Sequence, residues 1–183
     1  MDKIRCLDLG CGEQPQKINR NVDEYYGLDI IDTTNPNVEK CDLFVESIPF
    51  ESDYFDYVTA FDFIEHVPRV LYYKEKLVHP FIHVMNESYR VLKKEGIMII
   101  SVPSINSENN FFWNDPTHVN PITSDVFNTY FCTTPKEYKT PLHPWAKNYG
   151  FVGNFKILSC EEKQLKDFIG IKAYQININL QKI

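Results

Sequence analysis

Apolar and polar residues alternate along the chain in short runs that are separated by longer helical patterns. Runs of this length, rich in branched and aromatic side chains, are typical of buried strands. Five such strands are predicted, at 3–9 (KIRCLDL), 24–30 (EYYGLDI), near 38–43 (VEKCDL), 55–61 (FDYVTAF) and 97–102 (IMIISV).

The region between the fourth and fifth of these strands has a helical period. From Leu71 to Leu92 the apolar residues recur three, four or seven positions apart, which predicts amphipathic helices. Pro80 is expected to start the second of them, because proline fits the first turn of a helix. Gly96 is expected to end it before the fifth strand.

The last third of the chain predicts a short helix and two further strands. The helix covers 123–131, with Thr123 or Ser124 as its N-cap, and the strands at 154–163 and 172–180 form an antiparallel pair. Strands that alternate with helices indicate an α/β fold. We expect one domain over 1–183: a doubly wound, mostly parallel seven-stranded sheet with a C-terminal antiparallel hairpin and helices on both faces.

Composition narrows the classes of partner and the cellular location. The 183 residues carry a formal net charge of −6, so no overall basic field favours nucleic acid or an anionic membrane. The longest apolar run, 96–102, is too short to span a bilayer. Five cysteines form no CxxC pair, which indicates free thiols in the cytoplasm rather than disulfides or a zinc site.

Acidic residues follow three of the predicted strands. Asp8 precedes the turn that contains Gly10 and Gly12, and Asp29 and Asp42 end the second and third strands. Glycine lets a ligand approach the backbone closely, and a carboxylate about 20 residues later can accept both hydroxyls of a ribose. Nicotinamide cofactors and S-adenosylmethionine both have such a ribose.

The residues after the glycines distinguish these two cofactors. A dinucleotide turn has a third glycine, which lets the following helix approach the strand and bind a pyrophosphate, but here the chain reads GCGEQP. Glu13 would repel a pyrophosphate. S-adenosylmethionine has no phosphate and carries a sulfonium and an ammonium, so acidic neighbours favour it.

LDLGCG, YYGLDI, CDLFVESIPFESDYFDYVTAFDFIEHV and SYRVLKKEGIMIISVPS occur here in that order. With these motifs the chain resembles the small class I S-adenosylmethionine-dependent methyltransferases, in particular their type 11-like branch. The resemblance runs from about residue 4 to about 131, and more weakly onward through 147–151.

The resemblance implies where the methionine half of the cofactor would bind. Asp8, Gly10, Cys11 and Gly12 would line the methionine and ribose. Phe61, at the end of the fourth strand, would offer its carbonyl to the methionine ammonium. The Cys11 thiol is not expected to be a nucleophile, because nothing nearby in the sequence would stabilise a thiolate.

The resemblance also implies contacts with the adenosine half. Asp29 would hold the ribose hydroxyls, and Ile30 would pack on the adenine. Asp42 would accept a hydrogen bond from the adenine amino group, while the backbone N–H of Leu43 meets the ring.

The acceptor is less defined by the sequence. No NPPY-like or DPPY-like stretch follows the fourth strand and no Pro-Cys nucleophile is present, which disfavours methylation of a base, a glutamine amide or a cytosine carbon. His66, in DFIEHV, and His118, in DPTHVNP, each follow a strand's carboxyl end. Both are candidate catalytic residues, and His118 is a candidate general base or metal ligand. His79 and His83, four apart, are expected only to belong to a packed or solvated helix face.

A metal site is a second hypothesis for the same place. Asp62, Glu65 and His66 would share one side of a helical turn, and His118 would complete a site for magnesium, manganese or zinc. Similar turns occur in some metal-dependent members of the family. The alternative is that Glu65 and His66 cap a helix and support the methionine pocket.

Family relatives usually begin with helices that cover the substrate pocket, whereas here the first strand starts by residue 4. The cover is expected from 104–121, from 132–145, or from a partner chain, and a homodimer is expected. We predict methyl transfer to a small-molecule or carbohydrate-like acceptor at oxygen. The alternatives are a catalytically silent binding subunit and a nicotinamide-dependent oxidoreductase.

Overall fold

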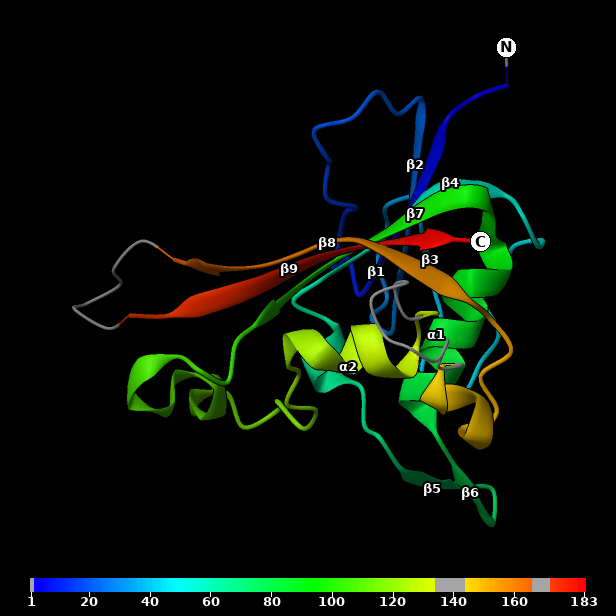
Figure 1. Ribbon diagram of the computed structural model, residues 1–183. Coiled ribbons are helices and arrows are strands. Elements are labelled where there is room, and N and C mark those ends of the chain that lie inside the picture. Colours follow the sequence, from blue (N-terminus) through cyan, green and yellow to red (C-terminus); the bar gives the residue numbers. More distant parts are fainter. Residues whose placement is uncertain (1, 134–143, 166–171) are drawn as a thin grey trace.

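The computed structural model describes residues 2–133, 144–165 and 172–183. They form a seven-stranded sheet in the order β3-β2-β1-β4-β7-β9-β8 (Figure 1). β9 is antiparallel to both of its neighbours, and all other pairs are parallel, which confirms the predicted α/β class. The strands are β1 (Arg5–Leu9), β2 (Glu24–Asp29), β3 (Val38–Lys40), β4 (Phe55–Phe61), β7 (Leu92–Pro103), β8 (Phe155–Gln164) and β9 (Tyr174–Lys182).

One face of the sheet forms the hydrophobic core. The register aligns Leu7, Val58, Met98 and Leu180 across four neighbouring strands, and all four side chains are fully buried. Because side chains alternate along each strand, this alignment places an apolar row on a single face.

Both α-helices cover this face. α1 (Pro80–Val91) buries Phe81, Val84 and Met85, spaced as one helical stripe, in the same core cluster as the strands. The ring of Phe81 meets that of Phe127 in α2 (Ser124–Tyr130), with centroids 6.1 Å apart. Pro80 therefore starts a helix as predicted.

The opposite face differs from the expectation of helices on both faces. Its row is Asp8, Thr59, Ile99 and Asn179, and it meets the segment 12–23, which forms no helix. This segment has few apolar residues and a proline, so it cannot bury a helical face. The α-helices that the structure describes thus lie on one side of the sheet.

A β-hairpin replaces the first predicted helix of the 71–92 region. β5 (Leu71–Tyr73) pairs with β6 (Lys76–Val78), and the hairpin projects from the body of the molecule (Figure 1). The two turn residues, Lys74 and Glu75, have positive φ values, as in a two-residue hairpin turn. Proline disfavours helical backbone in the residue before it, so Pro80 prevents a helix from running through this stretch into α1, although the apolar residues keep a helical spacing.

The prediction for Gly96 was wrong. α1 ends at Val91, and β7 begins at the next residue and runs through Gly96. A register shift in the pairing of β4 with β7 absorbs the residues between Leu92 and Ile97 as a bulge. Helix α2 and the antiparallel pair β8–β9 agree with their predictions, although the Thr123 N-cap makes no side-chain hydrogen bond.

Three 3₁₀ helices complete the described elements: η1 (Ile64–His66), η2 (Glu108–Asn114) and η3 (Trp145–Tyr149). η2 belongs to the expected covering segment 104–121, whereas most of the other, 132–145, lies outside the described residues. All five cysteines are free thiols. Within the described ranges, no helix has both the length and the apolar character needed to cross a membrane.

Candidate active site

A cavity of about 330 Å³ lies at the carboxyl ends of the parallel strands. This is the edge at which open α/β sheets bind ligands. Of the residues predicted to bind a cofactor, five line it: Gly10, Asp29, Ile30, Asp42 and Leu43. The other lining residues are Cys41, Phe44, Asp62, Phe63 and His66.

The turn after β1 depends on Gly10. Its φ of 68° is in the left-handed region, and its N–H donates to the carbonyl of Leu28 over 2.8 Å. A Cβ atom at this position would lie 2.4 Å from the ring of Phe63. The glycine therefore allows the aromatic wall of the cavity to pack directly on the backbone of the turn.

Asp29 connects two turns at the cavity. Its Oδ2 accepts a hydrogen bond from the N–H of Gly12 over 2.8 Å, and its Oδ1 accepts one from Ile31 over 3.2 Å. Each carboxylate oxygen can accept a second hydrogen bond. Asp29 is thus held in place and still has capacity to accept from two neighbouring hydroxyls.

The third strand end contributes a second acidic side chain. Asp42 Oδ1 accepts from the N–H of Phe44 over 3.1 Å, an Asx turn that fixes the carboxylate. The N–H of Leu43, expected to meet a ligand, donates to the carbonyl of Cys41 over 3.1 Å. A ligand would therefore have to compete with an internal hydrogen bond at Leu43.

Four residues predicted for cofactor binding do not line the cavity. Asp8 is buried, and its carboxylate accepts from Thr59 Oγ1 over 2.6 Å and from the N–H of Gln16 over 2.8 Å. Burial raises the pKa of Asp8 above its ordinary value. This carboxylate holds β1, β4 and the segment 12–23 together.

The other three are Cys11, Gly12 and Phe61. The Cys11 thiol contacts the carbonyl of Gly12, and burial raises its pKa to about 12, which agrees with a residue that is not a nucleophile. The side chain of Phe61 lines a separate hollow, on the opposite face of the sheet.

Glu65, His66 and His118 come together beside the cavity. Each of the three offers an atom that could coordinate a metal ion, and these atoms lie within 4.8 Å of one another. The centroids of the two imidazole rings are 4.8 Å apart. The carbonyl of Glu65 accepts from the N–H groups of Val119 and Asn120, both over 2.9 Å. These two bonds bring the loop that carries His118 onto η1.

The Glu65 carboxyl group is buried without a hydrogen bond to any described residue. It is fully buried, and neither side-chain oxygen has a hydrogen-bond partner in the described structure. Burial raises the pKa of Glu65 to about 8. A buried carboxyl group without a partner is costly, and such groups are frequent at functional sites.

Hydrogen bonds define the tautomers of both histidines. Nδ1 of His118 lies 2.6 Å from the carbonyl oxygen of Phe112, which can only accept, so Nδ1 carries the proton. Nδ1 of His66 lies 3.0 Å from Thr117 Oγ1, whose own proton is donated to Asp115 over 2.5 Å. In each neutral ring Nε2 therefore keeps its lone pair, available to a proton or a metal ion.

Asp62 does not join this cluster. Its φ of 47° places it outside η1, and its Oδ1 accepts from Gln175 Nε2 over 3.2 Å. Because the helical turn covers only Ile64–His66, the spacing of Asp62 to Glu65 does not bring their side chains together. The four-residue set is thereby reduced to three.

His79 and His83 form no cluster of metal-ligand type in the described chain. His79 Nδ1 contacts the carbonyl of Arg69, and His83 Nε2 that of Glu46. The structure adds partners that the sequence analysis missed: Thr117 and Asp115 beside the histidines, and the aromatic walls Phe44 and Phe63. Only the Asp-x-Thr spacing of an Asx turn signalled any of these.

The sheet order and the position of the cavity are those of the class I, Rossmann-like S-adenosylmethionine-dependent methyltransferases. A methyltransferase domain family model matches residues 2–151, and the chain belongs to this family. The protein is therefore a methyltransferase, of a family that uses S-adenosylmethionine. A search of curated proteins gave no match.

Solved structures share the fold. A SAM-dependent methyltransferase from Archaeoglobus fulgidus has 20% identity and a TM-score of 0.53, with 99% of this chain and 86% of that chain covered. YcgJ from Bacillus subtilis has 14% identity and a TM-score of 0.56, with 98% and 92% covered. The [4+2]-cyclase SpnF has 14% identity and a TM-score of 0.58, with 98% and 74% covered. At these identities the likeness shows the fold alone.

Proposed function

We propose that the protein transfers a methyl group from S-adenosylmethionine to a hydroxyl oxygen of a small-molecule or carbohydrate-like acceptor. The observation that carries this proposal is the cluster of Glu65, His66 and His118, since His66 also lines the cavity at the strand ends. An unpartnered carboxyl group and two imidazoles beside a methyl donor suit an acceptor that must lose a proton.

The cofactor would occupy the cavity with its ribose at Asp29. The two free acceptor positions of this carboxylate support a bond to each ribose hydroxyl. Ile30, largely exposed at the cavity rim, would cover one face of the adenine, and Asp42 would accept from its amino group. The methionine half would lie along Gly10 and Gly12 toward the carbonyl of Phe61.

The proposed reaction is a direct displacement. The acceptor oxygen forms a bond to the methyl carbon while the bond from that carbon to sulfur breaks, which leaves S-adenosylhomocysteine. The hydroxyl proton would pass to Nε2 of His118, whose Nδ1 proton is held by the Phe112 carbonyl. His66 and Glu65 would orient the acceptor hydroxyl beside it.

We keep a divalent ion as a second proposal for the same three side chains. The family match gives no support for a metal, but the unpartnered Glu65 carboxyl group and the Nε2 atoms of the two imidazoles are a suitable donor set for zinc or manganese. Nε2 of His118 also lies 3.8 Å from Oδ2 of Asp115. When bound, such an ion lowers the pKa of a coordinated hydroxyl. Calorimetric titration with Zn²⁺ or Mn²⁺ tests this without an acceptor, and absence of binding to the wild-type protein ends the idea.

The nicotinamide alternative is disfavoured by the turn after β1. Dinucleotide sites place the pyrophosphate at the N-terminus of a helix that follows the glycine turn. Here residues 12–23 form no helix, and Glu13 follows Gly12 directly. Measured turnover of any acceptor would exclude the alternative of a catalytically silent binding subunit.

A panel of acceptors with methyl-labelled S-adenosylmethionine tests the proposed function. Among small phenols, sugars, amines and carboxylates, label is expected in hydroxyl compounds. His118→Ala should lower kcat by about 10²–10⁴-fold with little change in cofactor affinity, because it removes the base and not the cofactor cavity. His83→Ala, whose ring contacts the Glu46 carbonyl instead, is the matched control. Labelling of amines alone, or full activity of His118→Ala, would contradict the proposal.

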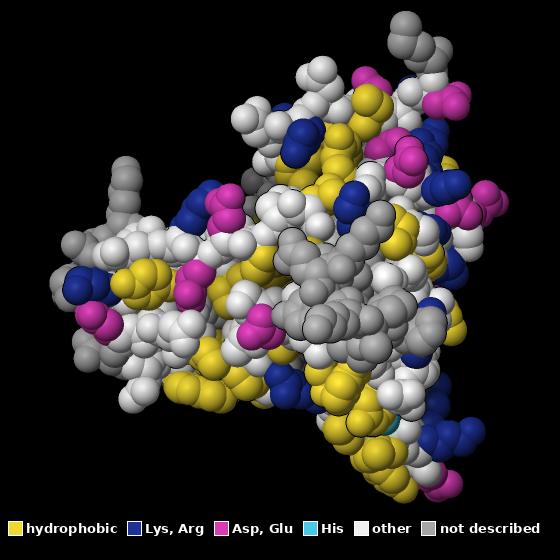
Figure 2. Space-filling view, in the orientation of Figure 1, with side chains coloured by type: hydrophobic (Ala, Val, Ile, Leu, Met, Phe, Trp, Pro, Cys, Tyr) yellow, Lys and Arg dark blue, Asp and Glu magenta, His cyan; other side chains and the backbone are white. Residues whose placement is uncertain are grey.

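We also propose that a second copy of this chain, or a partner chain, helps to cover the substrate pocket. Hydrophobic side chains gather over the β5–β6 hairpin (Figure 2), where Val70, Tyr72 and Leu77 are more than half exposed. Light scattering tests self-association, and a mass of 21.5 kDa at high concentration would exclude a homodimer. The five free thiols support the cytoplasm as the proposed location.

A further inference from the structure

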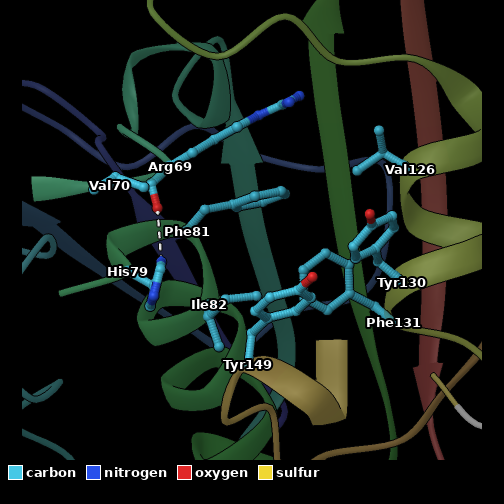
Figure 3. Close-up of a pocket in the computed structure, with 9 residues that line it drawn as sticks. All are labelled: Arg69, Val70, His79, Phe81, Ile82, Val126, Tyr130, Phe131 and Tyr149. Carbon is cyan, nitrogen blue, oxygen red and sulfur yellow. Dashed lines mark hydrogen bonds between the residues drawn. The ribbon is translucent and has the colours of Figure 1, made fainter. Parts of the chain in front are cut away.

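A second cavity, of about 300 Å³, lies on the helical face of the sheet. It is enclosed by the first turn of α1, by α2, by η3 and by the residues that precede the β5–β6 hairpin (Figure 3). None of its lining residues lines the cavity at the strand ends. The two cavities are therefore distinct.

The walls of this second cavity are apolar. Phe81 and Ile82 of α1 face Val126 of α2, with Phe131 beside them (Figure 3). Phe81 and Phe131 are almost fully buried, and their rings meet edge to face, with centroids 5.2 Å apart. Since both rings are fixed by the core, the cavity is formed before any ligand enters.

The rim carries two hydroxyl groups. Tyr130 and Tyr149 lie on opposite elements, α2 and η3, and are 36% and 57% exposed. Neither hydroxyl has a hydrogen-bond partner among the residues that the structure describes. A ligand can therefore bond to them without displacing a hydrogen bond from any of these residues.

The rim also carries one cation, Arg69. Its Nε donates to Asn120 Oδ1 over 2.7 Å and one terminal nitrogen donates to the Pro121 carbonyl over 2.8 Å, both neutral acceptors. In Figure 3 its side chain extends across the top of the cavity toward α2. No carboxylate within the described ranges pairs with it, although the protein is acidic overall.

The same side chain connects this cavity to the candidate active site. Asn120, which accepts from Arg69, also donates to the carbonyls of Ile64 and Glu65. Arg69 itself follows His66 by three residues. The guanidinium is therefore held at the cavity by the loop that orders the candidate catalytic cluster, and its partners among the described residues are neutral.

From these features we propose that the second cavity binds a small amphipathic anion. Its body is an aromatic ring or a short branched alkyl group, which the walls of Phe81, Ile82 and Val126 cover. Its single negative charge lies against the guanidinium donors of Arg69 that the bonds to Asn120 and Pro121 leave unused, where no carboxylate of the described residues competes for a charge-assisted pair. A sugar is excluded as occupant, because the apolar walls would leave most of its hydroxyls without partners.

Two probes with the same ring system test the proposal. Indole-3-acetate carries the anionic group, and indole-3-ethanol is its neutral counterpart. Calorimetry or ligand-detected NMR should give a Kd of about 1 mM or tighter for the anion, as expected for a ligand of this size in a preformed site. Arg69→Gln should weaken the anion about tenfold and the alcohol less than about twofold.

Two further variants fill the cavity from different walls. Val126→Trp and Ile82→Trp should each weaken both probes at least about tenfold, and either one suffices if the other does not fold. Val152→Ser, at an exposed position outside both cavities and away from the hairpin, is the matched control and should leave both affinities unchanged. Circular dichroism and S-adenosylhomocysteine affinity check that each variant is folded, independently of the probes.

The proposal is overturned if the wild-type protein binds neither probe at millimolar concentration, or if both tryptophan variants bind them normally. Equal binding of the two probes, with no effect of Arg69→Gln, overturns the anionic part. Probe binding that disappears as the protein concentration rises would instead mean that a second copy covers the cavity, and would also overturn it.

Discussion

Asp29 has two tasks at one carboxylate. It fixes the turn at Gly12 and the start of the next loop at Ile31, and it faces the cavity at the strand ends. Because the backbone N–H groups hold it in place, the carboxylate does not need to be ordered by a ligand. This preorganisation increases the affinity it can contribute.

We predict that Asp29→Ala lowers the affinity for S-adenosylhomocysteine at least tenfold. Two charge-assisted hydrogen bonds to ribose would be lost, a cost on the order of 2–4 kcal/mol. Calorimetry measures the change, and circular dichroism checks the fold. Asp32→Ala removes a neighbouring, exposed carboxylate that pairs with Lys40, and this variant should bind normally. Equal affinities for both variants would contradict the assignment of Asp29.

At the level of single residues, the acidic residues of the cavity were easier to predict from the sequence than its apolar residues. The positions of Asp29 and Asp42 at the cavity were predictable because Asp29 ends β2 and Asp42 follows β3 by two residues, and strand ends meet at one edge of a parallel sheet. The ring of Phe63 against Gly10 was not, since it depends on how two loops pack. Asp62 was misplaced because its positive φ interrupts the helical turn that its spacing suggested.

The turn after β1 is the element on which the cofactor cavity depends. Gly10 and Gly12 both have positive φ values, but only at Gly10 would a Cβ meet other atoms. A comparison of substitutions at the two glycines therefore distinguishes the cost of backbone strain from the cost of a steric clash.

Gly10→Ala should destabilise the protein by roughly 2–5 kcal/mol, from strain and from the clash with Phe63. Gly12→Ala, which adds a methyl group in open space, should cost about 1 kcal/mol through strain alone. Urea unfolding of the two variants measures the difference. A Gly12→Ala variant as unstable as Gly10→Ala would show that the ring of Phe63 does not limit the turn.

Asp8 connects β1 and β4 with the segment 12–23, and it should make stability depend on pH. Burial raises its pKa in the folded protein, an effect that the bonds from Gln16 and Thr59 partly oppose. A raised folded pKa favours the protonated form in the fold. This stabilisation is present below the unfolded pKa of about 4 and is lost as the pH rises through the folded value.

Relative to Asp8→Asn, the wild-type protein should therefore lose free energy of unfolding as the pH rises above about 4. Urea unfolding without cofactor at several pH values measures the difference, in which the contributions of all other groups cancel. A difference that grows in favour of the wild-type protein as pH rises would mean that the folded pKa of Asp8 is lowered.

Most strands were predictable because their apolar runs are short and bounded by turns. Phe55–Phe61 matches its prediction at both ends. The stretch from Leu71 to Val78 was not predictable by period, since apolar residues seven apart suit a helix as well as a hairpin. The expectation of helices on both faces of the sheet failed because the segment 12–23 lacks an apolar face, although this lack is visible in the sequence.

At the scale of the whole molecule, one short segment of the chain contributes lining residues to both cavities. Residues 64–70 carry Glu65 and His66 of the candidate catalytic cluster at one end and Arg69 at the other, and Asn120 bonds to both ends. The cavity at the strand ends suits a cationic nucleoside cofactor, and the cavity between α1 and α2 suits an apolar anion. Both depend on the same sheet, whose carboxyl edge positions the loops.

The central claim is that the cavity at the strand ends binds the methyl donor. Isothermal titration of the wild-type protein with S-adenosylhomocysteine, and separately with NAD, tests it most directly. We predict one S-adenosylhomocysteine per chain with a Kd in the micromolar range or below, competition by S-adenosylmethionine, and no heat from NAD. Binding of NAD in preference to S-adenosylhomocysteine, or of neither compound, would contradict the account.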